Sequence, residues 1–480
     1  MGVPQDRRFD VCIVGAGPGG LAALSAIIEP YSLDDLANDQ AERAAHTCPP
    51  KRPSVCVVDP EPWLHCWRNR FAALGISWLR SPAMAHPDAF DAWSLAAFAR
   101  ESGRCSEVLP TNAEEWKVVK GLGDAQAGLF GLPSSQLFLD YCDELVARLP
   151  HTLVRSKAVS VSGGDGDYRV GLADGSSVAA GSVVLALGVP GPPAVPPAFA
   201  NLPERVAFHT EDCGRLSGLD KDLRVLVVGG GLTAVQAAQL AVRQGCRVSL
   251  CSRRRLVTRD FDIPAEWFDY RTQGRLRHDF WTQPSEARLA LLRATKGGGS
   301  VPPRYMQELR AMEATGKVQV VCGEAEVGSA DEEGVGVKLA GQWRRFDRVV
   351  LACGHRPDCA KLPLVRELQA QWPVAVVGGL PVLSKDLQWG GCEQLFVVGA
   401  LAALQVGPDA ANLMGCRRAA QVVAQSLGLR LWQRSLRPRD GSLTICGNRY
   451  AAFEDSEDDE KSTDAETPGS APSSEAAWEQ

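Results

Sequence analysis

The chain carries the same glycine-rich pattern twice, at positions 11–24 and 225–245. The first copy, VCIVGAGPGGLAAL, places Gly15, Gly17 and Gly20 between a short apolar run and a helix-forming segment. In this spacing the first glycine permits a tight turn, the second lets a pyrophosphate approach the backbone, and the third lets the helix pack closely on the strand. The N–H groups at the start of the helix then face the phosphates. The pattern predicts a strand–turn–helix unit that binds a dinucleotide.

The second copy, VLVVGGGLTAVQAAQLAVRQG, has Gly229, Gly231 and Ala234 at the same three positions and predicts a second such unit. The strand that follows its helix, CRVSLC, runs into the arginines of an SRRR segment. Guanidinium groups bind a 2′-phosphate through charge-assisted hydrogen bonds. Arg253 and Arg254 therefore predict NADPH as the second ligand, and a solvated basic loop is the alternative interpretation.

The strand after the first helix, SVCVVD, ends instead in Asp59. A carboxylate at this place accepts hydrogen bonds from the adenosine ribose hydroxyls and would repel a 2′-phosphate, so the first site is predicted to bind FAD. Asp59 comes later in the chain than is usual because the polar, proline-flanked segment 29–53 is predicted to be a surface insertion. A glycine-rich turn without a ligand is the alternative interpretation.

A longer repeat surrounds the two turns. Each copy is followed by a β-hairpin pattern and a strand that ends in glycine, at Gly188 and at Gly354. A last strand runs into Gly399, and the helix after it is expected to begin near Asp409, with its N-terminus toward the flavin. The predicted fold class is α/β, a flavoprotein with two dinucleotide-binding domains: an FAD-binding Rossmann-like domain with an inserted NADPH-binding Rossmann-like domain.

The repeats divide the chain into four predicted segments. These are the first part of the FAD-binding domain at 1–202, the NADPH-binding domain at 203–345, the second part of the FAD-binding domain at 346–453, and an acidic tail at 454–480. The tail, EDSEDDEKSTDAETPGSAPSSEAAWEQ, is poor in apolar residues and is predicted to be disordered.

Charge and composition exclude several classes of partner. The 480 residues have a formal net charge of −6 and no long basic tract, which argues against nucleic acid as a ligand. No run of about 18 or more apolar residues occurs, so no membrane span is predicted, and no apolar signal region precedes the first strand. These features predict a cytoplasmic protein with a small-molecule substrate, and they leave a homo-oligomer open.

The electrons of a reduced flavin need an acceptor, and the sequence contains no recognisable disulfide or metal relay. No C-x-x-C pair is present, and Cys246 and Cys251 lie along one predicted strand, on opposite faces and beyond disulfide reach. The seven histidines are dispersed, so no metal site is predicted.

Several segments resemble the class B flavoprotein monooxygenases, and within them the ornithine and lysine N-hydroxylases. The aromatic-rich segment that these enzymes carry after their second strand is matched by PWLHCWRNRFAALGISWLRSPAMAHPDAF, and the segment that follows it by LPSSQLFLDYCDELVARL. Their D-x-x-x-L-A-T-G-Y-x-P motif is similar to DRVVLACGHRP, which departs from it at Cys353 and His355. The resemblance runs from Phe9 to about Leu427.

The resemblance implies a chemistry and a set of site residues. NADPH would reduce FAD, O2 would add to flavin C4a, and the resulting C4a-hydroperoxyflavin would transfer oxygen to a small nucleophile such as an amine. Arg80 aligns with the lysine that binds the substrate carboxylate in this family, and Asn412 lies in the segment where the family has a serine. His209 and Thr210 lie where related monooxygenases have a His-Ser or His-Thr pair, with an interdomain linker as the alternative. The predicted pocket-lining residues are Trp63, Trp67, Trp78 and Trp93.

The sequence leaves three functions open. The first is an FAD- and NADPH-dependent monooxygenase that hydroxylates a small amine with O2. The second is an NADPH-dependent flavoprotein reductase or oxidase that transfers no oxygen, and the third is a regulatory flavoprotein. Analysis of the products separates the first two, and the lack of NADPH turnover would favour the third.

Overall fold

The computed structural model describes residues 8–29, 52–110, 127–164, 166–188, 191–268 and 270–435. The described residues up to Trp432 form one compact unit, which contains both glycine-rich turns. The predicted acidic tail at 454–480 and nearly all of the predicted insertion at 29–53 lie outside the described residues. None of the described helices is long and apolar enough to cross a membrane.

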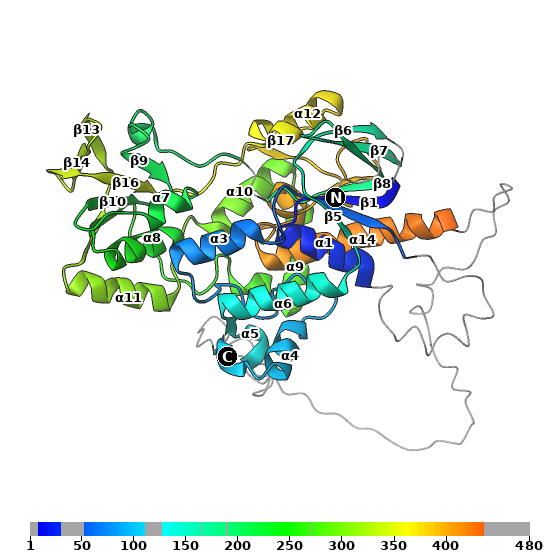
Figure 1. Ribbon diagram of the computed structural model, residues 1–480, viewed down its shortest axis with the longest axis horizontal. Coiled ribbons are helices and arrows are strands. Elements are labelled where there is room, and N and C mark those ends of the chain that lie inside the picture. Colours follow the sequence, from blue (N-terminus) through cyan, green and yellow to red (C-terminus); the bar gives the residue numbers. More distant parts are fainter. Residues whose placement is uncertain are drawn as a thin grey trace, which may run out of the picture. The chain divides into compact units, whose positions relative to one another are not determined.

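Seven strands form the first sheet, in the order β5-β2-β1-β8-β7-β6, with β19 also paired to β8 (Figure 1). Their bounds are β1 Arg8–Val14, β2 Val55–Val58, β5 Thr152–Val154, β6 Ala158–Gly164, β7 Asp167–Leu172, β8 Ser177–Leu185 and β19 Leu395–Val397. β8 pairs with β7 antiparallel through its first residues and with β1 and β19 parallel through its last. The predicted hairpin therefore leads directly into the parallel part of the sheet.

The parallel strands of this sheet are apolar runs because both of their faces are covered. All four residues of β2 and the last four of β1 are buried, and α1 is buried from Gly20 to its end. The helices of these parts of the chain are α1 Pro18–Ile28, α3 His65–Leu74, α4 Ser94–Glu101, α5 Ala127–Phe130, α6 Ser135–Arg148, α12 Pro363–Gln371, α13 Ala403–Val406 and α14 Leu413–Ser435. Two short antiparallel pairs are β3 Val108–Leu109 with β4 Leu132–Pro133, and β17 Val376–Val377 with β18 Leu380–Pro381.

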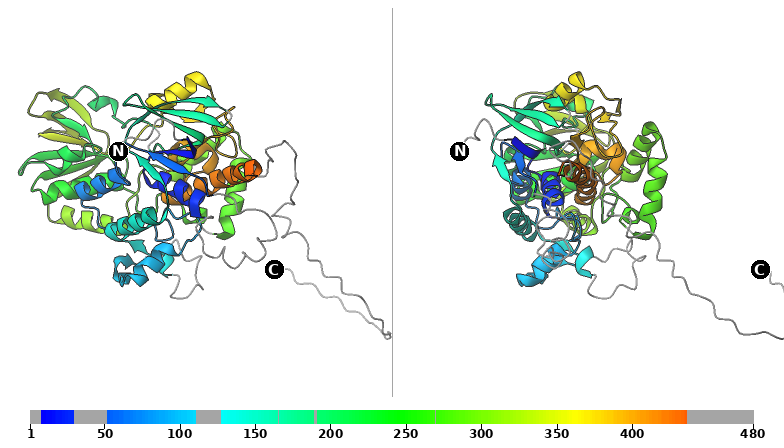
Figure 2. Two further views of the ribbon diagram at one scale, coloured as in Figure 1. Left: turned by 45° about the vertical axis from the view of Figure 1, so that its right-hand side comes forward. Right: turned by 90° about the vertical axis from the view of Figure 1, so that its right-hand side faces the viewer.

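Five parallel strands form the second sheet, in the order β12-β11-β10-β16-β9, and the left view of Figure 2 shows them in green and yellow-green with helices packed beside them. Their bounds are β9 Ala207–His209, β10 Arg224–Val228, β11 Arg247–Ser252, β12 Val318–Cys322 and β16 Arg348–Leu351. A separate antiparallel sheet contains β13 Glu326–Ala330, β14 Val335–Leu339 and β15 Gln342–Phe346. The helices are α7 Cys213–Ser217, α8 Leu232–Arg243, α9 Tyr270–Trp281, α10 Ser285–Lys296 and α11 Pro303–Ala314. One mixed and one parallel sheet, each containing a strand, a glycine-rich turn and a helix in succession, confirm the predicted α/β fold class.

The second copy of the repeat is broken where the first is continuous. Asp347 separates β15 from β16, and its carboxylate accepts hydrogen bonds from the Arg224 backbone N–H (2.7 Å) and guanidinium (2.9 Å). β16 then pairs parallel with β10 on one side and with β9 on the other, inside the second sheet. The chain therefore leaves the second sheet after Leu351, later than the predicted boundary at 345/346. The other predicted domain limits stay predictions.

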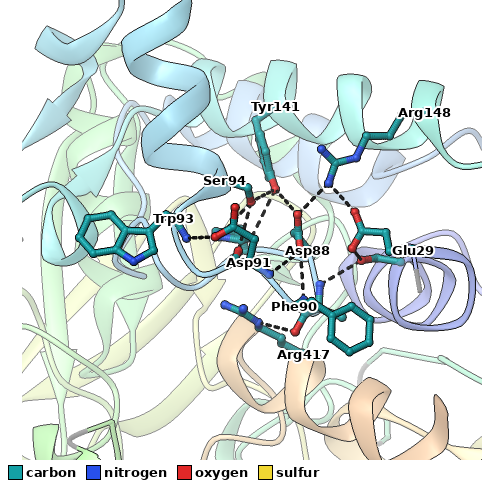
Figure 3. A network of polar contacts seen from close by, with 12 residues as sticks. Glu29, Asp88, Phe90, Asp91, Trp93, Ser94, Tyr141, Arg148 and Arg417 are labelled. Atoms are coloured by element: carbon teal, nitrogen blue, oxygen red, sulfur yellow. Dashed lines mark hydrogen bonds and ion pairs between the residues drawn. The ribbon is translucent and has the colours of Figure 1, made fainter. Parts of the chain in front are cut away.

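A buried polar network holds the loop between α3 and α4 (Figure 3). Arg148, at the end of α6, donates to the Asp88 carboxylate at 2.7 Å and pairs with Glu29, which follows α1. Arg417 of α14 donates to the Ala89 backbone carbonyl at 3.0 Å. Asp88 and Arg417 are both buried. Chain segments that are distant in sequence thus fix one loop through polar contacts, of which the Asp88 carboxylate and the Arg417 guanidinium are buried.

His86 of this loop generates a prediction about stability at low pH. Burial, with Arg417 nearby, lowers the pKa of His86 to about 3, whereas a histidine in the unfolded chain titrates near pH 6.5. Below about pH 6.5 the unfolded state therefore binds a proton that the native state does not, and the stability contribution is lost as the pH falls toward 3. As the pH falls through that window, the free energy of unfolding of the wild-type protein should decrease by up to about 1.4 kcal/mol per pH unit more than that of His86→Gln.

Urea unfolding of the two proteins between about pH 7 and pH 5 measures this difference, with the exposed His278→Gln as the matched control. Equal pH slopes in the wild type and His86→Gln would show that another group causes the loss.

Candidate functional site

The first glycine-rich turn joins β1 to α1 in the geometry that its sequence predicts. Gly15 has φ +114°, and a Cβ there would lie 2.4 Å from the Ala186 carbonyl oxygen. A Cβ on Gly20 would lie 1.9 Å from the Gly15 carbonyl oxygen, so neither position accepts a side chain. Nothing lies within 4 Å of the direction in which a Cβ on Gly17 would point. The turn is therefore packed at its first and third glycines and open at Gly17, where a pyrophosphate would approach.

The surroundings of this turn fit the adenosine diphosphate half of FAD. α1 begins directly after Gly17 without a side-chain cap, which leaves its first N–H groups for an anion. Asp59, at the end of β2, accepts the Ala16 and Glu61 backbone N–H groups, each at 2.8 Å and each on a different carboxylate oxygen. Both oxygens keep a further lone pair, which a ribose hydroxyl can use.

A cavity of about 660 Å³ lies beside the first turn. Its wall contains the turn, the ends of β8 and β19, the start of α14, and side chains of α3 and α10. Gly188 and Gly399 lie at these two strand ends with φ +78° and +79°, and nothing lies within 4 Å of either Cβ direction. Gly354, with φ +72°, has the same open surroundings and directly precedes the wall residue His355. The cavity is thus at the carboxyl ends of parallel strands, where open α/β sheets bind their ligands, and it has the size of a cofactor pocket.

The fixed charges in this wall are all positive. Arg70, Arg293 and Lys296 line the cavity, and no carboxylate is among the lining residues. Arg70 is paired with Glu211 at 3.7 Å. Arg293 and Lys296 lie three residues apart at the end of α10, and neither forms an ion pair with another residue in the described part of the chain. The cavity therefore favours an anionic group near α10.

His355 of this wall lies against His209, a histidine that the sequence identifies for a separate reason. The rings of His209, at the end of β9, and His355 are 5.6 Å apart in an edge-on arrangement. His355 Nε2 is bonded to the Glu211 carboxylate, and burial lowers the pKa of His209. The departure from the resembled motif at His355 thus places an imidazole ring with a carboxylate partner in the cavity wall.

The start of α14 differs from the prediction. The helix begins at Leu413, not near Asp409. The Asp409 carboxylate is instead buried in a paired contact with the Arg418 guanidinium (2.9 Å for one of its two hydrogen bonds). The Asn412 side-chain oxygen accepts the Gly415 backbone N–H at 3.1 Å and caps the helix. Asn412 also lines the cavity, and its predicted substrate role stays a prediction.

The second turn has the same strand–turn–helix arrangement but different surroundings. Gly229 has φ +153°, and a Cβ there would lie 2.4 Å from the Ala352 carbonyl oxygen. Ala234, at the third position, is fully buried in α8. Gly231 precedes α8 without a side-chain cap, yet a Cβ on it would lie 3.4 Å from the Cα of Gly299. The chain itself therefore covers this turn.

The two arginines predicted to bind a 2′-phosphate are exposed directly after β11. The Arg254 guanidinium lies against Gly298, since a Cβ on that glycine would be 1.5 Å from Arg254 Nη2. Neither Arg253 nor Arg254 forms an ion pair with another described residue. Their predicted role in nucleotide binding stays a prediction.

Arg80 is not among the residues that line the cavity, and its guanidinium donates hydrogen bonds to other residues of the protein. Its Nε donates to the Asp260 carbonyl at 2.9 Å, and its Nη2 to the Arg259 carbonyl at 3.0 Å. Ser300 accepts from the same guanidinium through its carbonyl (3.2 Å) and its hydroxyl (2.8 Å). The predicted substrate role of Arg80 stays a prediction, but the side chain joins two segments of the inserted domain in this structure.

Sequence reasoning identified the turns but missed the contribution of α10. Of the four predicted tryptophans, Trp67 is a wall residue and the other three are not. Leu289, Leu292, Arg293 and Lys296 line the cavity instead. Their spacing indicates one helix face, but only the tertiary packing decides which face meets the cavity.

A family model for pyridine nucleotide-disulphide oxidoreductases matches residues 9–273, more than half of the chain. The chain belongs to this family. This match confirms the prediction of an oxidoreductase enzyme. No curated protein sequence matches the chain significantly.

Several solved structures share the fold of this family member at low sequence identity. An FAD-bound cadaverine monooxygenase from Erwinia amylovora has a TM-score of 0.64 and 17% identity, covering 88% of this chain and 95% of that chain. An ornithine hydroxylase from Pseudomonas aeruginosa, in its reduced form, has a TM-score of 0.64 and 16% identity, covering 88% and 100%. An ornithine N-hydroxylase from Kutzneria sp. 744, with reduced FAD, NADP+ and L-ornithine, has a TM-score of 0.66 and 16% identity, with the same coverage. These likenesses confirm the fold class of a flavoprotein with two dinucleotide-binding domains.

Gly17 and Gly20, the second and third glycines of the fingerprint, generate a matched prediction. Gly17→Ala places a methyl group in open space at a backbone conformation that alanine adopts, so the apoprotein should keep its stability. The same methyl group should weaken FAD binding about tenfold or more, because it occupies the side from which the pyrophosphate approaches. Gly20→Ala should instead destabilise the apoprotein by about 1–3 kcal/mol through its clash with the Gly15 carbonyl.

Titration of both apoproteins with FAD, followed by flavin fluorescence, measures the first effect, and thermal unfolding without FAD measures the second. Unchanged FAD affinity in Gly17→Ala would contradict the assignment of this turn.

Proposed function

We propose that this oxidoreductase is an FAD- and NADPH-dependent monooxygenase that hydroxylates the nitrogen of a small amine with O2. The observation that carries the proposal is that one cavity extends from the open first turn to Arg293 and Lys296 of α10. Bound FAD would supply hydride acceptance and O2 activation in this cavity. The similar structures are named for small amine substrates, ornithine and cadaverine.

The cavity wall argues against a disulfide substrate or relay. Cys416 is its one cysteine, and burial raises the pKa of that thiol to about 12. A thiol with a raised pKa forms little thiolate and reacts slowly in disulfide exchange. Cys246 and Cys251, the pair that the sequence offered, are both free and buried in the second domain. These observations argue against disulfide chemistry in this cavity, and product analysis separates oxygen transfer from a reductase or oxidase with another acceptor.

The residues of this chain have three tasks in the proposed reaction. The first turn and Asp59 hold the adenosine diphosphate half of FAD, and Arg253 and Arg254 select NADPH through its 2′-phosphate. The apolar wall residues exclude water around the reacting centre. His355 can take the proton that the amine must lose before it acts as a nucleophile: its Nε2 faces Glu211, which leaves Nδ1 as the accepting atom.

The basic side chains of α10 point to a substrate that also carries a carboxylate. Arg80 was expected in this role, but its hydrogen bonds are taken up by backbone carbonyls and Ser300. Arg293 and Lys296 line the cavity without a carboxylate partner among the described residues. We therefore propose that they bind the substrate carboxylate, which makes an amino acid with a side-chain amine the favoured substrate class.

Product analysis tests the monooxygenase proposal. The FAD-loaded protein, supplied with NADPH, O2 and ornithine, lysine or cadaverine in turn, should form a hydroxylamine product with at least one of them, in an amount that follows the NADPH consumed. Mass spectrometry measures the product, and a peroxidase assay measures the hydrogen peroxide released. Stoichiometric hydrogen peroxide without any hydroxylated product would favour the oxidase alternative, and no NADPH consumption would favour a regulatory flavoprotein.

A charge-removal pair tests the substrate class. Arg293→Ala and Lys296→Ala should each raise KM for the preferred amino acid about tenfold, because each removes a charge-assisted contact to its carboxylate. The value of kcat/KM for cadaverine, which has no carboxylate, should change by less than about twofold. Arg310→Ala, at an exposed arginine of α11, is the control. Equal losses of kcat/KM for the amino acid and for cadaverine would show that Arg293 and Lys296 do not bind the substrate carboxylate.

A further inference from the structure

Residues Gly297–Ser300, here called the strap, lie directly on the second glycine-rich turn. A Cβ on Gly299 would be 2.6 Å from the Gly231 Cα and 2.9 Å from the Gly231 nitrogen. At the corresponding glycine of the first turn, Gly17, nothing lies within 4 Å. Gly231 is the position at which a pyrophosphate would approach the backbone. The strap therefore lies where the second nucleotide would place its phosphates.

Each of the three glycines of the strap is favoured for a different structural reason. Gly297 has φ +56° and ends α10 in the left-handed conformation. Gly298 has φ +84°, and the Arg254 guanidinium fills the place of its side chain. Gly299 allows the close approach to Gly231. The GGG sequence thus fits this packed position and is not merely a flexible link.

The far end of the strap is anchored. Ser300 is 3% exposed and accepts two hydrogen bonds from Arg80, at its carbonyl (3.2 Å) and at its hydroxyl (2.8 Å). The next residue, Val301, donates its N–H to the Val257 carbonyl at 2.8 Å, and its own carbonyl accepts the Arg259 N–H at 3.0 Å. Arg80 is therefore the side chain that ties the strap to the segment after β11.

We propose that the strap competes with the pyrophosphate of NADPH for the second turn, and that Arg80 is the positioning residue that holds the strap in place. NADPH then binds only to molecules whose strap has moved away, so its apparent affinity is reduced by the fraction of open molecules. The 2′-phosphate assists the exchange, because it draws Arg254 away from Gly298. This inference rests on the proposed use of NADPH.

Gly299→Ala tests the competition directly. Its methyl group cannot coexist with Gly231 at 2.6 Å, so the strap should be displaced. NADPH should bind to the oxidised holoprotein about threefold more tightly or better, and should associate faster, than in the wild type. Gly274→Ala is the control, because nothing lies within 4 Å of that Cβ direction. Isothermal titration and stopped-flow fluorescence measure binding without turnover.

Arg80→Lys is a second variant, and it distinguishes a role of Arg80 in holding the strap from a role in binding the substrate carboxylate. Loss of the forked contact to Ser300 should also strengthen NADPH binding, whereas a residue that binds only the substrate carboxylate would raise KM for the substrate and leave NADPH binding unchanged. Hydrogen exchange at the start of α8 should be faster in both variants than in the wild type, which reports the displaced strap independently of the ligand.

The outcomes separate this inference from the proposed function. Two results for Gly299→Ala would overturn the competition. One is unchanged or weaker NADPH binding although hydrogen exchange shows that the strap is displaced. The other is hydrogen exchange at the start of α8 as slow as in the wild type, which would show that the strap has not moved. If NADPH binds to neither protein, both the competition and the proposed cofactor are wrong. If Gly299→Ala binds NADPH more tightly but no amine is hydroxylated, the competition stands and the monooxygenase proposal fails.

Discussion

Backbone-to-backbone packing at glycine is the constraint on which both dinucleotide turns depend. A Cβ on Gly15 or on Gly229 would lie 2.4 Å from a carbonyl oxygen of the neighbouring strand, Ala186 in one case and Ala352 in the other. The same contact in both copies brings the start of a helix to the carboxyl end of a parallel sheet, where its N–H groups meet an anion. The position of the first turn beside the cavity and the predicted ligand class both depend on this local geometry.

The second glycine of each turn then distinguishes the two sites. Gly17 is open, while Gly231 is covered by Gly299. The first turn is therefore open to a cofactor that stays bound. At the second turn, the ligand has to displace part of the chain before it can bind. This difference suits a flavoprotein in which FAD stays bound and NADPH binds and leaves in each cycle.

Local sequence was sufficient for features that depend on neighbouring residues. The turns at Gly15 and Gly229, the hairpins after them and the position of Asp59 are properties of short segments with fixed spacing. Features that depend on distant packing were not predictable. Arg293 and Lys296 of α10 line the cavity only because segments from distant parts of the sequence pack together. Arg80 and Ser300, which are 220 residues apart, come into contact for the same reason. The buried pair of Asp409 and Arg418 likewise depends on how the chain packs before α14.

The number of dinucleotides bound to the purified protein tests this account most directly. Native mass spectrometry should find one FAD per chain and no stoichiometric NADP(H) before nucleotide is added, and one of each after NADPH is supplied. A protein that is purified with NADP(H) bound in equal amount would show that the second turn is freely accessible. A protein that takes up no FAD would contradict the assignment of the first turn and of the cavity beside it.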